Sequence, residues 1–501
     1  MMHNLLLGLT LLAAEAAIAQ QIISVASSVP AGASKSVDKS FPGLTFEVSS
    51  FYNYAIADGK PNTFSQNLIN DIFSRTGGTP ILRVGGTSGD HGHFDANQKE
   101  SVNFPATIRG PAFDKPYLAL GPSYFEAYKS FPNAKFLFMV PHEQVYLGEQ
   151  PISNTIEWAR HGLAVIGDRL DALEIGNEPD FYPRITHQKY IDSSLKIQAA
   201  LQKEFPKLLT GKPIFQTIDK AWNPLSPWPI SAFSKMNTTG AIKQVAYHFY
   251  PHGFSSLTPS ILQRRIANHT HLVASMTFIA EKVRFWNAQN RPKRILMDEV
   301  ASTMAWGEGH NNLITALWSV DYQLHCAAIG VERVHHQQIV RPGFNMWQPV
   351  PSKFAPPQVR ANFYAMPFVA DFLGKNPSRV NAIPLKGSDT LAAYSAWEGG
   401  RIKRIAVVNL KVWNKGQGQG ARGFVNFKIE NLGAVRSARV NYLTSPDGGK
   451  AEDSLTWSGL QWTYESNGKG VRVKNDEKIV AVKDGVMNVA VEASSAVIIE
   501  F

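Results

Sequence analysis

The chain has 501 residues, which is more than one hydrophobic core usually supports, so we expect two domains. Its composition, 44% hydrophobic and 18% charged, is that of a globular protein, and its single cysteine, Cys326, excludes an intramolecular disulfide and a thiolate metal cluster. The formal net charge is +10, but Lys and Arg are dispersed, which excludes the basic stripe of a nucleic-acid binder and leaves either a generally solvated basic surface or an acidic glycan partner.

The N-terminus has the pattern of an export signal. Residues 5–12 are almost wholly apolar, and residues 17–19 read Ala-Ile-Ala before Gln20. This pattern predicts a signal peptide over residues 1–19 and a secreted protein. The apolar stretch is too short to cross a bilayer, and no later stretch is long enough, so no membrane span is expected. Sequons at Asn237 and Asn268 agree with export.

Residues 41–355 alternate apolar, strand-like runs with longer helical patterns. A helix is expected from Asn62 or Thr63 to Gly77, and Asn154 with Glu157 suggests a capping box. Near-continuous apolar strands joined by helices predict an α/β fold, a (β/α)8 TIM barrel. An open doubly wound sheet is the alternative, but no nucleotide fingerprint follows the first strand. The eight runs are residues 44–50, 80–86, 135–140, 172–176, 213–218, 244–250, 294–300 and 332–336.

Beyond residue 355 the pattern changes to short strands separated by turn signals. Runs at 390–396, 404–410, 424–429, 437–443 and 486–491 predict an antiparallel β-sandwich over residues 356–501. The extended segment 20–40, ahead of the first barrel strand, is expected to join that sandwich. A G-x-G-x-x-G match at 418–423 leads into a strand and not a helix, so it is interpreted as a loop.

Two glutamates stand at the ends of separate barrel strands. Glu178 follows the fourth strand in Gly-Asn-Glu-Pro, and Glu299 ends the seventh in Met-Asp-Glu-Val. Functional residues of such barrels gather at the C-terminal ends of the strands. Cleaving a glycosidic bond needs two carboxyl groups, one to protonate the leaving oxygen and one to attack or stabilise the anomeric carbon. Asp298, beside Glu299, is expected to point to the opposite face of its strand.

The order Asn-Glu on strand four and Glu on strand seven resembles the large clan A of retaining barrel glycosidases. Within it the chain is similar to glycoside hydrolase family 79, the β-glucuronidase and heparanase-related group, and particularly to its fungal members. The resemblance covers essentially the whole mature chain. Its matching segments are 44–47, 83–88, 173–180, 247–251, 297–299 and 316–331.

The resemblance implies a secreted retaining enzyme that removes β-linked glucuronic acid, or its 4-O-methyl form, from glycans or glycoconjugates. Glu178 would be the general acid/base and Glu299 the nucleophile. Asn177 would hydrogen-bond the sugar 2-hydroxyl. Neither a cofactor nor a metal is expected. The histidines at 91, 93, 335 and 336 are interpreted as rim residues, because zinc needs three or four convergent ligands.

Three further residues receive roles from the same resemblance, and each has a structural alternative. Tyr250 would hold the nucleophile carboxylate in line, or would be a rim aromatic. Arg83 would keep that carboxylate ionised, or would be an ion-pair partner within the barrel. Glu47, at the tip of strand one, would accept a hydrogen bond from a sugar hydroxyl.

The sequence departs from the family where substrate choice is decided. The family's glucuronidases hold the uronate carboxylate with tyrosines in the loops after strands seven and eight, and neither loop contains a tyrosine here. Trp306, His310, Arg341 and Asn345 are the candidate replacements. A clan A enzyme acting on a neutral glucoside, xyloside or galactoside is therefore the alternative. A non-catalytic glycan-binding protein is a further one.

Overall fold

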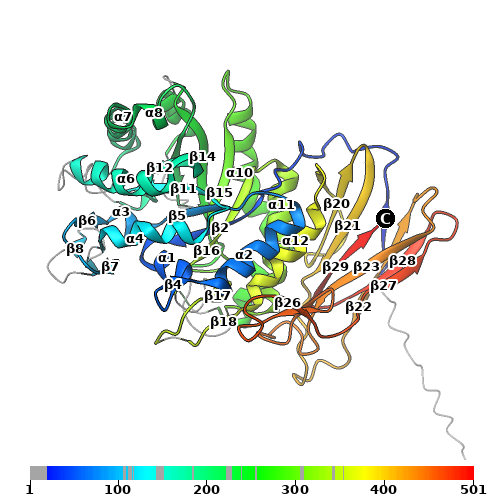
Figure 1. Cartoon of the computed structure of the whole chain (residues 1–501). Helices are drawn as coiled ribbons and strands as arrows, with labels where there is room; N and C mark the ends of the chain where they lie inside the picture. Colours follow the sequence, from blue (N-terminus) through cyan, green and yellow to red (C-terminus); the bar gives the residue numbers. More distant parts are fainter. Residues whose placement is uncertain are drawn as a thin grey trace, which may run out of the picture.

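The computed structural model consists of a closed parallel barrel beside a β-domain (Figure 1). It describes residues 20–104, 109–110, 115–116, 118–142, 152–182, 185–221, 228–237, 240–253, 255, 257–304, 310–340, 345–353 and 355–501. The predicted signal peptide lies outside these residues. The barrel strands in chain order are β2 (Pro42–Glu47), β5 (Ile81–Gly85), β11 (Lys135–Val140), β12 (Leu170–Ile175), β13 (Phe215–Lys220), β14 (Ile242–Phe249), β15 (Arg294–Val300) and β16 (Arg333–Gln338).

All eight predicted barrel strands are present, and β16 pairs with β2 to close the barrel. The first strand ends at Glu47, three residues earlier than expected, because residues from Val48 form the helix α1 (Val48–Ala55). The strand ends here because the helical conformation of α1 places the side chains of Val48, Phe51 and Tyr54 in the hydrophobic core.

Helices cover the outside of the barrel. In α2 (Thr63–Thr76) the Asn62 side chain caps the first turn and Gly77 ends the helix at φ 65°, as expected. The capping-box prediction was wrong: Asn154 lies inside α6 (Ile152–Ile166) and bonds Phe94 N and Gly92 O instead. The other main helices are α4 (Pro122–Glu126), α7 (His187–Glu204), α10 (His269–Asn287), α11 (Leu313–Ile329) and α12 (Ala365–Leu373).

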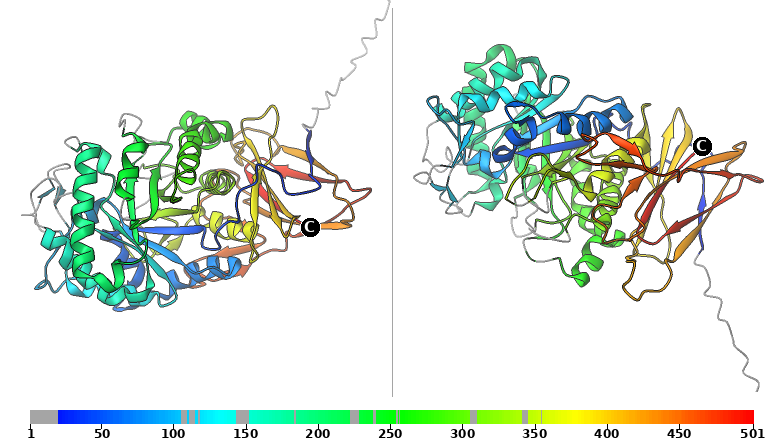
Figure 2. Two further views of the ribbon diagram at one scale, coloured as in Figure 1. Left: turned by 90° about the horizontal axis from the view of Figure 1, so that it is seen from above. Right: turned by 60° about the horizontal axis from the view of Figure 1, so that its bottom comes forward.

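Two sheets form the β-domain, seen clearly apart from the barrel in Figure 2. Their facing sides share a core that includes Ile405, Val440, Phe427 and Val491. The smaller sheet has the order β1 (Gln20–Ser24), β22 (Phe424–Glu430) and β28 (Met487–Glu492). The larger contains β19 (Arg379–Ala382), β20 (Leu391–Glu398), β21 (Arg401–Asn409), β29 (Ser495–Glu500), β23 (Ser437–Thr444), β24 (Thr456–Trp457), β25 (Leu460–Trp462), β26 (Gly470–Arg472) and β27 (Lys478–Ala481).

Helix α11 connects the two parts of the molecule. Its residues from Leu313 to Ala327 are all buried, because it lies between the barrel and the β-domain (Figure 1). Its first amides donate to β-domain carbonyls, Leu313 N to Ala451 O at 2.8 Å and Ile314 N to Gly449 O at 3.0 Å. Further along, Asp321 accepts from Tyr394 Oη at 2.5 Å. The β-domain therefore satisfies donors that a helix start leaves without intrahelical partners.

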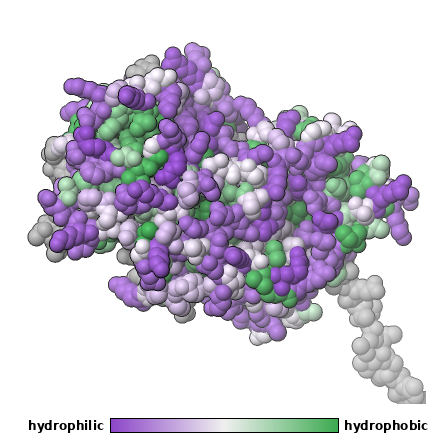
Figure 3. Space-filling view, viewed as in Figure 1, coloured by the Kyte–Doolittle hydropathy of each residue, from purple (hydrophilic) through white to green (hydrophobic). Residues whose placement is uncertain are grey.

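The surface is mainly hydrophilic on the face shown in Figure 3, with hydrophobic residues in small groups. Exposed large hydrophobic side chains include Ile22, Phe424 and Ile479, all in the β-domain. Among the described residues, no helix combines the length and the hydropathy needed to cross a bilayer.

Candidate active site

Glu178 lies directly beyond the end of β12 and is held in a rare backbone conformation. Its φ and ψ are 46° and 51°, in the left-handed region, and Gly176 two residues earlier is also left-handed at φ 79°. The Glu178 amide donates to the carbonyl of Asp219 on β13 at 2.9 Å. A non-glycine residue in this region is strained, and such strain is found where a side chain must be aimed.

Glu299 lies on β15, opposite Glu178, and both of its carboxylate oxygens are bound. Tyr250 Oη donates to Oε1 at 2.8 Å, and Arg83 Nη1 donates to Oε2 at 2.8 Å. Glu299 itself is 6% exposed and Arg83 is fully buried. The two donors fix the plane of the carboxylate, and the bond from the guanidinium is charge-assisted.

Arg83 also binds two other side chains inside the barrel, those of Glu174 and Asn177, which together form the barrel floor. Its guanidinium donates to Glu174 at 2.6 Å and to the Asn177 side-chain oxygen at 2.9 Å. The Asn177 nitrogen in turn donates to Thr87 Oγ1 at 3.3 Å. Arg83 is therefore an ion-pair partner within the barrel that also binds Glu299, and its part in catalysis stays a prediction.

Asp298 does not point away from Glu299, and that expectation was wrong. Asp298 Oδ2 lies 3.3 Å from Arg83 Nε, so both neighbours reach the same guanidinium. The cause is a β-bulge: along β14 and β15, Met297 pairs with Tyr247 and Glu299 with the next residue, His248, which leaves Asp298 as the extra residue. A bulge breaks the alternation of faces, which sequence spacing alone assumes.

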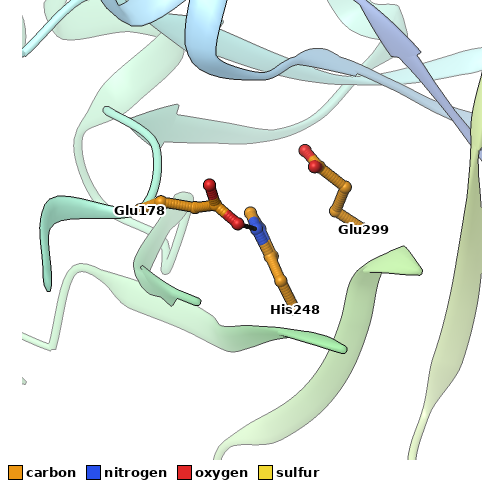
Figure 4. Close-up of side chains that lie close together, drawn as sticks. All are labelled: Glu178, His248 and Glu299. Carbon is orange, nitrogen blue, oxygen red and sulfur yellow. Dashed lines mark hydrogen bonds and ion pairs between the residues drawn. The ribbon is translucent and has the colours of Figure 1, made fainter. Parts of the chain in front are cut away.

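His248 is a candidate site residue that the sequence did not reveal. Its Nδ1 lies 2.9 Å from Glu178 Oε1, and its Nε2 lies 3.3 Å from Asp298 Oδ1 (Figure 4 shows the bond to Glu178). The segment Tyr-His-Phe-Tyr had drawn attention only to Tyr250, which stands two residues later, directly beyond the end of β14. The alternation of side chains along a strand could have indicated it, because residues two apart, such as His248 and Tyr250, point to the same face.

Burial and neighbouring charges shift the pKa values of Glu178 and His248. Burial raises the pKa of Glu178, the Glu299 carboxylate adds to the rise, and the His248 hydrogen bond opposes it. Burial lowers the pKa of His248, but Glu299 and the two carboxyl groups in contact with the ring outweigh it and raise the pKa well above its usual value. An oxygen of Glu178 and an oxygen of Glu299 lie within 4.8 Å of each other.

Glu47 stands at the end of β2, close enough to Glu299 for the charge of that carboxylate to affect its pKa. Its carboxylate accepts from the Ser88 amide at 2.9 Å and from the Ser88 hydroxyl, and Gln337 Nε2 lies 3.4 Å away. Burial, with Glu299 as the second cause, raises the pKa of Glu47 to about 7 against the Ser88 hydrogen bonds. Gly86, at φ 112°, leaves the space that the carboxylate fills, since a Cβ there would meet it at 2.3 Å.

The two predicted loop contacts have different outcomes. Trp306, with Arg341, falls outside the described residues. Asn345 is fully buried, and its nitrogen donates to Trp347 O at 3.0 Å and to Gln348 Oε1 at 3.1 Å. Asn345 therefore braces the loop after β16, and its contact with substrate stays a prediction.

Two groups of side chains have metal-ligand chemistry, and each contains His248. One is Glu178, His248 and Glu299, and the other is Asp219, His248 and Asp298. The positively charged guanidinium of Arg83 lies 2.8 Å from Glu299 and 3.3 Å from Asp298. A metal ion bound in either group would therefore be repelled by a fixed positive charge. These residues do not fit a resident metal.

Comparison with known proteins supplies relatives over the whole length of the chain. Residues 393–498 match the glycosyl hydrolase family 79 C-terminal beta domain. A β-glucuronidase of Aspergillus niger is 28% identical, with 95% of this chain and 93% of that protein aligned. A β-glucuronidase of Neurospora crassa is 27% identical, with 96% of each covered.

Solved structures show the same architecture. A 4-O-α-L-rhamnosyl-β-D-glucuronidase from Fusarium oxysporum 12S, in complex with Rha-GlcA, superposes with a TM-score of 0.79 at 19% identity, covering 96% of this chain and all of that one. A family 51 α-L-arabinofuranosidase from Bifidobacterium longum superposes at 0.61 and 13% identity, covering 96% and 99%. At these identities the superpositions establish the fold alone.

A parallel barrel with paired glutamates at its strand ends, fused to a β-sandwich and aligned along its length with glucuronide-cleaving enzymes, is a glycosidase. The matched C-terminal domain and the two fungal relatives narrow the class further. Over residues 393–498 the chain matches the family 79 C-terminal domain, and along its length it is similar to the two fungal β-glucuronidases.

Proposed function

We propose that this protein is a retaining β-glucuronidase in which Glu178 is the acid/base and Glu299 the nucleophile. The observation that carries the proposal is the spacing of the two carboxyl groups. Oxygens of Glu178 and Glu299 lie within 4.8 Å. Retaining enzymes place their carboxyl groups about 5–5.5 Å apart, whereas inverting enzymes keep about 6.5–9.5 Å to admit a water.

In the first step the two glutamates act from opposite sides of the scissile bond. Glu299, held by Tyr250 and Arg83, attacks the anomeric carbon as the bond to the leaving oxygen breaks. Glu178, whose pKa burial raises, gives its proton to that oxygen. The products of this step are the free leaving group and an ester between the sugar and Glu299.

The second step uses the same groups in reverse. Once Glu299 is esterified its negative charge is gone, and with it one of the causes that raise the pKa of Glu178. Glu178, now ionised, takes a proton from a water that attacks the anomeric carbon. The ester bond breaks, Glu299 returns as a carboxylate, and the sugar leaves with its original configuration.

A β-linked glucuronide is the proposed substrate because both fungal relatives are β-glucuronidases and align over more than nine-tenths of the chain. The net charge of +10 favours an acidic glycan as the source of that sugar. We further propose that the protein is secreted, which the apolar leader pattern of residues 1–19 supports. N-terminal sequencing of protein recovered from the medium would read from Gln20; a start at Met1 would contradict this.

The test is hydrolysis of an aryl β-D-glucuronide beside the aryl β-glucoside, β-xyloside and β-galactoside. Glu299→Gln is the blank, and Glu281→Gln, an exposed glutamate on α10, is the matched control. We expect turnover of the glucuronide that is lost in the blank and unchanged in the control. Turnover of a neutral glycoside alone would overturn the substrate, and turnover that persists in Glu299→Gln would overturn the site.

The mechanism has its own readout. The first-formed sugar, followed by proton NMR, should be the β-anomer, and the α-anomer would refute retention. Glu178→Gln should lose most activity toward a phenyl glycoside and far less toward a dinitrophenyl glycoside, because a good leaving group needs no proton. Equal loss on both substrates would remove Glu178 from the acid role.

A further inference from the structure

A group of buried polar atoms lies behind Glu178, away from the atoms assigned to the reaction. Asp219 Oδ2, His248 Nε2 and Asp298 Oδ1 are each buried and lack a well-formed hydrogen bond within the described part of the chain. Polar atoms of the three residues lie within 4.8 Å of one another. His248 Nε2 and Asp298 Oδ1 are the closest measured pair, at 3.3 Å. Buried polar atoms usually find partners, so this group calls for a functional account.

Acidic groups surround the His248 ring from every neighbouring strand. The ionisable groups that interact with it are Glu174 and Glu178 of the β12 end, Asp219 of β13, and Asp298 and Glu299 of β15; Arg83 of β5 and His335 of β16 interact with Asp298. Burial lowers the pKa of His335 to about 4, so this second imidazole is neutral. Arg83 is therefore the one fixed cation among these groups, and carboxylates favour a charged His248.

Asp219 does not compete with Asp298 for the imidazolium. Burial, with Glu174 and Asp298 as further causes, raises the pKa of Asp219 well above its usual value, which favours its neutral form. Its backbone is also strained, at φ 41° after Ile218 at φ 79°, where β13 loses its regular pairing with β14, and its carbonyl accepts the Glu178 amide. Asp298, in contrast, has a pKa lowered by Arg83 and His248 against the effect of burial, so it is the anion.

We propose that His248 and Asp298 form a positioning pair that controls the proton of Glu178. Asp298 keeps the imidazolium charged from the Nε2 side, and the Nδ1–H donates to Glu178 Oε1. The transferable proton is thereby confined to the other oxygen, Oε2. The same imidazolium stabilises the Glu178 carboxylate once that proton has left. The inference rests on the proposed acid role of Glu178.

Asp298 can act on the pKa of Glu178 directly through space or through His248, and the two routes predict opposite shifts. Removing the negative charge of Asp298 would, acting directly through space, lower the pKa of Glu178. Acting through His248 it does the opposite, because the ring loses its anion, becomes neutral, and no longer places a positive charge 2.9 Å from Glu178. The pKa of Glu178 then rises.

The experiment compares pH profiles of kcat/KM for wild type, His248→Asn, Asp298→Asn and the double variant, on whichever aryl glycoside the wild type hydrolyses. The alkaline limb reports the acid, Glu178. We expect both single variants to move that limb upward by about one pH unit, the effect of losing an opposite charge within 4–6 Å. In the double variant the Asp298 change should add no further upward shift.

A downward or absent shift in Asp298→Asn, or shifts of the two variants that add, would overturn the proposal. His269→Asn is the matched control, since His269 pairs with Asp321 at 2.9 Å on the outside of the barrel, and its profile should match wild type. If Asp298→Asn does not fold, His248→Gln carries the test, because loss of the imidazole must raise the limb in the same way.

A second readout keeps this test separate from the proposed activity. NMR of 13C-labelled histidine reports the charge of His248 without any turnover. We expect the ring to stay charged at pH 7 in wild type and to be neutral in Asp298→Asn. A neutral ring in wild type would refute the pair even in an enzyme with the proposed activity, whereas a charged ring in a protein that cleaves no glycoside would refute only the activity.

Discussion

Replacing Arg83 by methionine tests how far one buried cation holds the barrel floor together. The side chain is fully buried and contacts three carboxylates, those of Glu174, Asp298 and Glu299, at 2.6, 3.3 and 2.8 Å. Methionine preserves the apolar stem and removes the charge. Breaking a single buried ion pair by removing one partner costs about 3–5 kcal/mol, and here three carboxyl groups lose their partner, so we expect the upper end of that range.

The melting temperature is the practical measure of this loss. Unfolding entropy of about 2.1 cal/mol/K per residue amounts to roughly 1 kcal/mol per kelvin for a chain of this length, so the expected fall is about 5 °C. Arg160→Met is the control, because Arg160 pairs with Glu157 and Glu204 at side-chain exposures of 38–46%, where a pair contributes at most about 1 kcal/mol. Equal shifts in the two variants would refute the reasoning.

The same variant should lose less at low pH. Asp298 has a folded pKa below its unfolded value, so the stability it contributes is present above the unfolded pKa and disappears as the pH falls. Without Arg83 the pKa of Asp298 rises, and the penalty exists only where the carboxyl is ionised in the unfolded chain. The gap in melting temperature should therefore be widest at pH 7 and should narrow toward pH 4. A gap independent of pH would place the loss in packing rather than in charge.

Two further substitutions test single contacts of the site. Tyr250→Phe removes the 2.8 Å bond to Glu299 and should lower kcat/KM about 10- to 100-fold, the range for a hydrogen bond to a charged group, while Tyr128→Phe, which removes a buried hydroxyl without a bond in the described chain, should leave it unchanged. Glu47→Gln should gain melting temperature over wild type between pH 5 and pH 7, because a folded pKa of about 7 makes wild-type Glu47 lose stability as the pH rises through that window. An unchanged difference would show that Glu47 is not held neutral.

The sequence predicts the barrel because burial on both faces makes its strands apolar throughout, and it predicts Glu178 and Glu299 because strand ends collect functional residues. It fails at Asp298, where a bulge changes the face of one residue without leaving a mark in the composition. It fails at His248 because a buried histidine acquires its role from Glu178 and Asp298, residues distant in sequence. Strand alternation can place such a residue on a face, but the charges around it are known only after the strands close.

The place of α11 limits how this fold can be divided. This helix follows the strand that carries Glu299, and its first amides are satisfied by carbonyls of Gly449 and Ala451, more than a hundred residues later. A chain cut after the barrel would leave the Leu313 and Ile314 amides without these acceptors and the apolar outer side of the helix in water. The β-domain is thus no interchangeable module. We expect the enzyme to be inherited, engineered and unfolded as one piece.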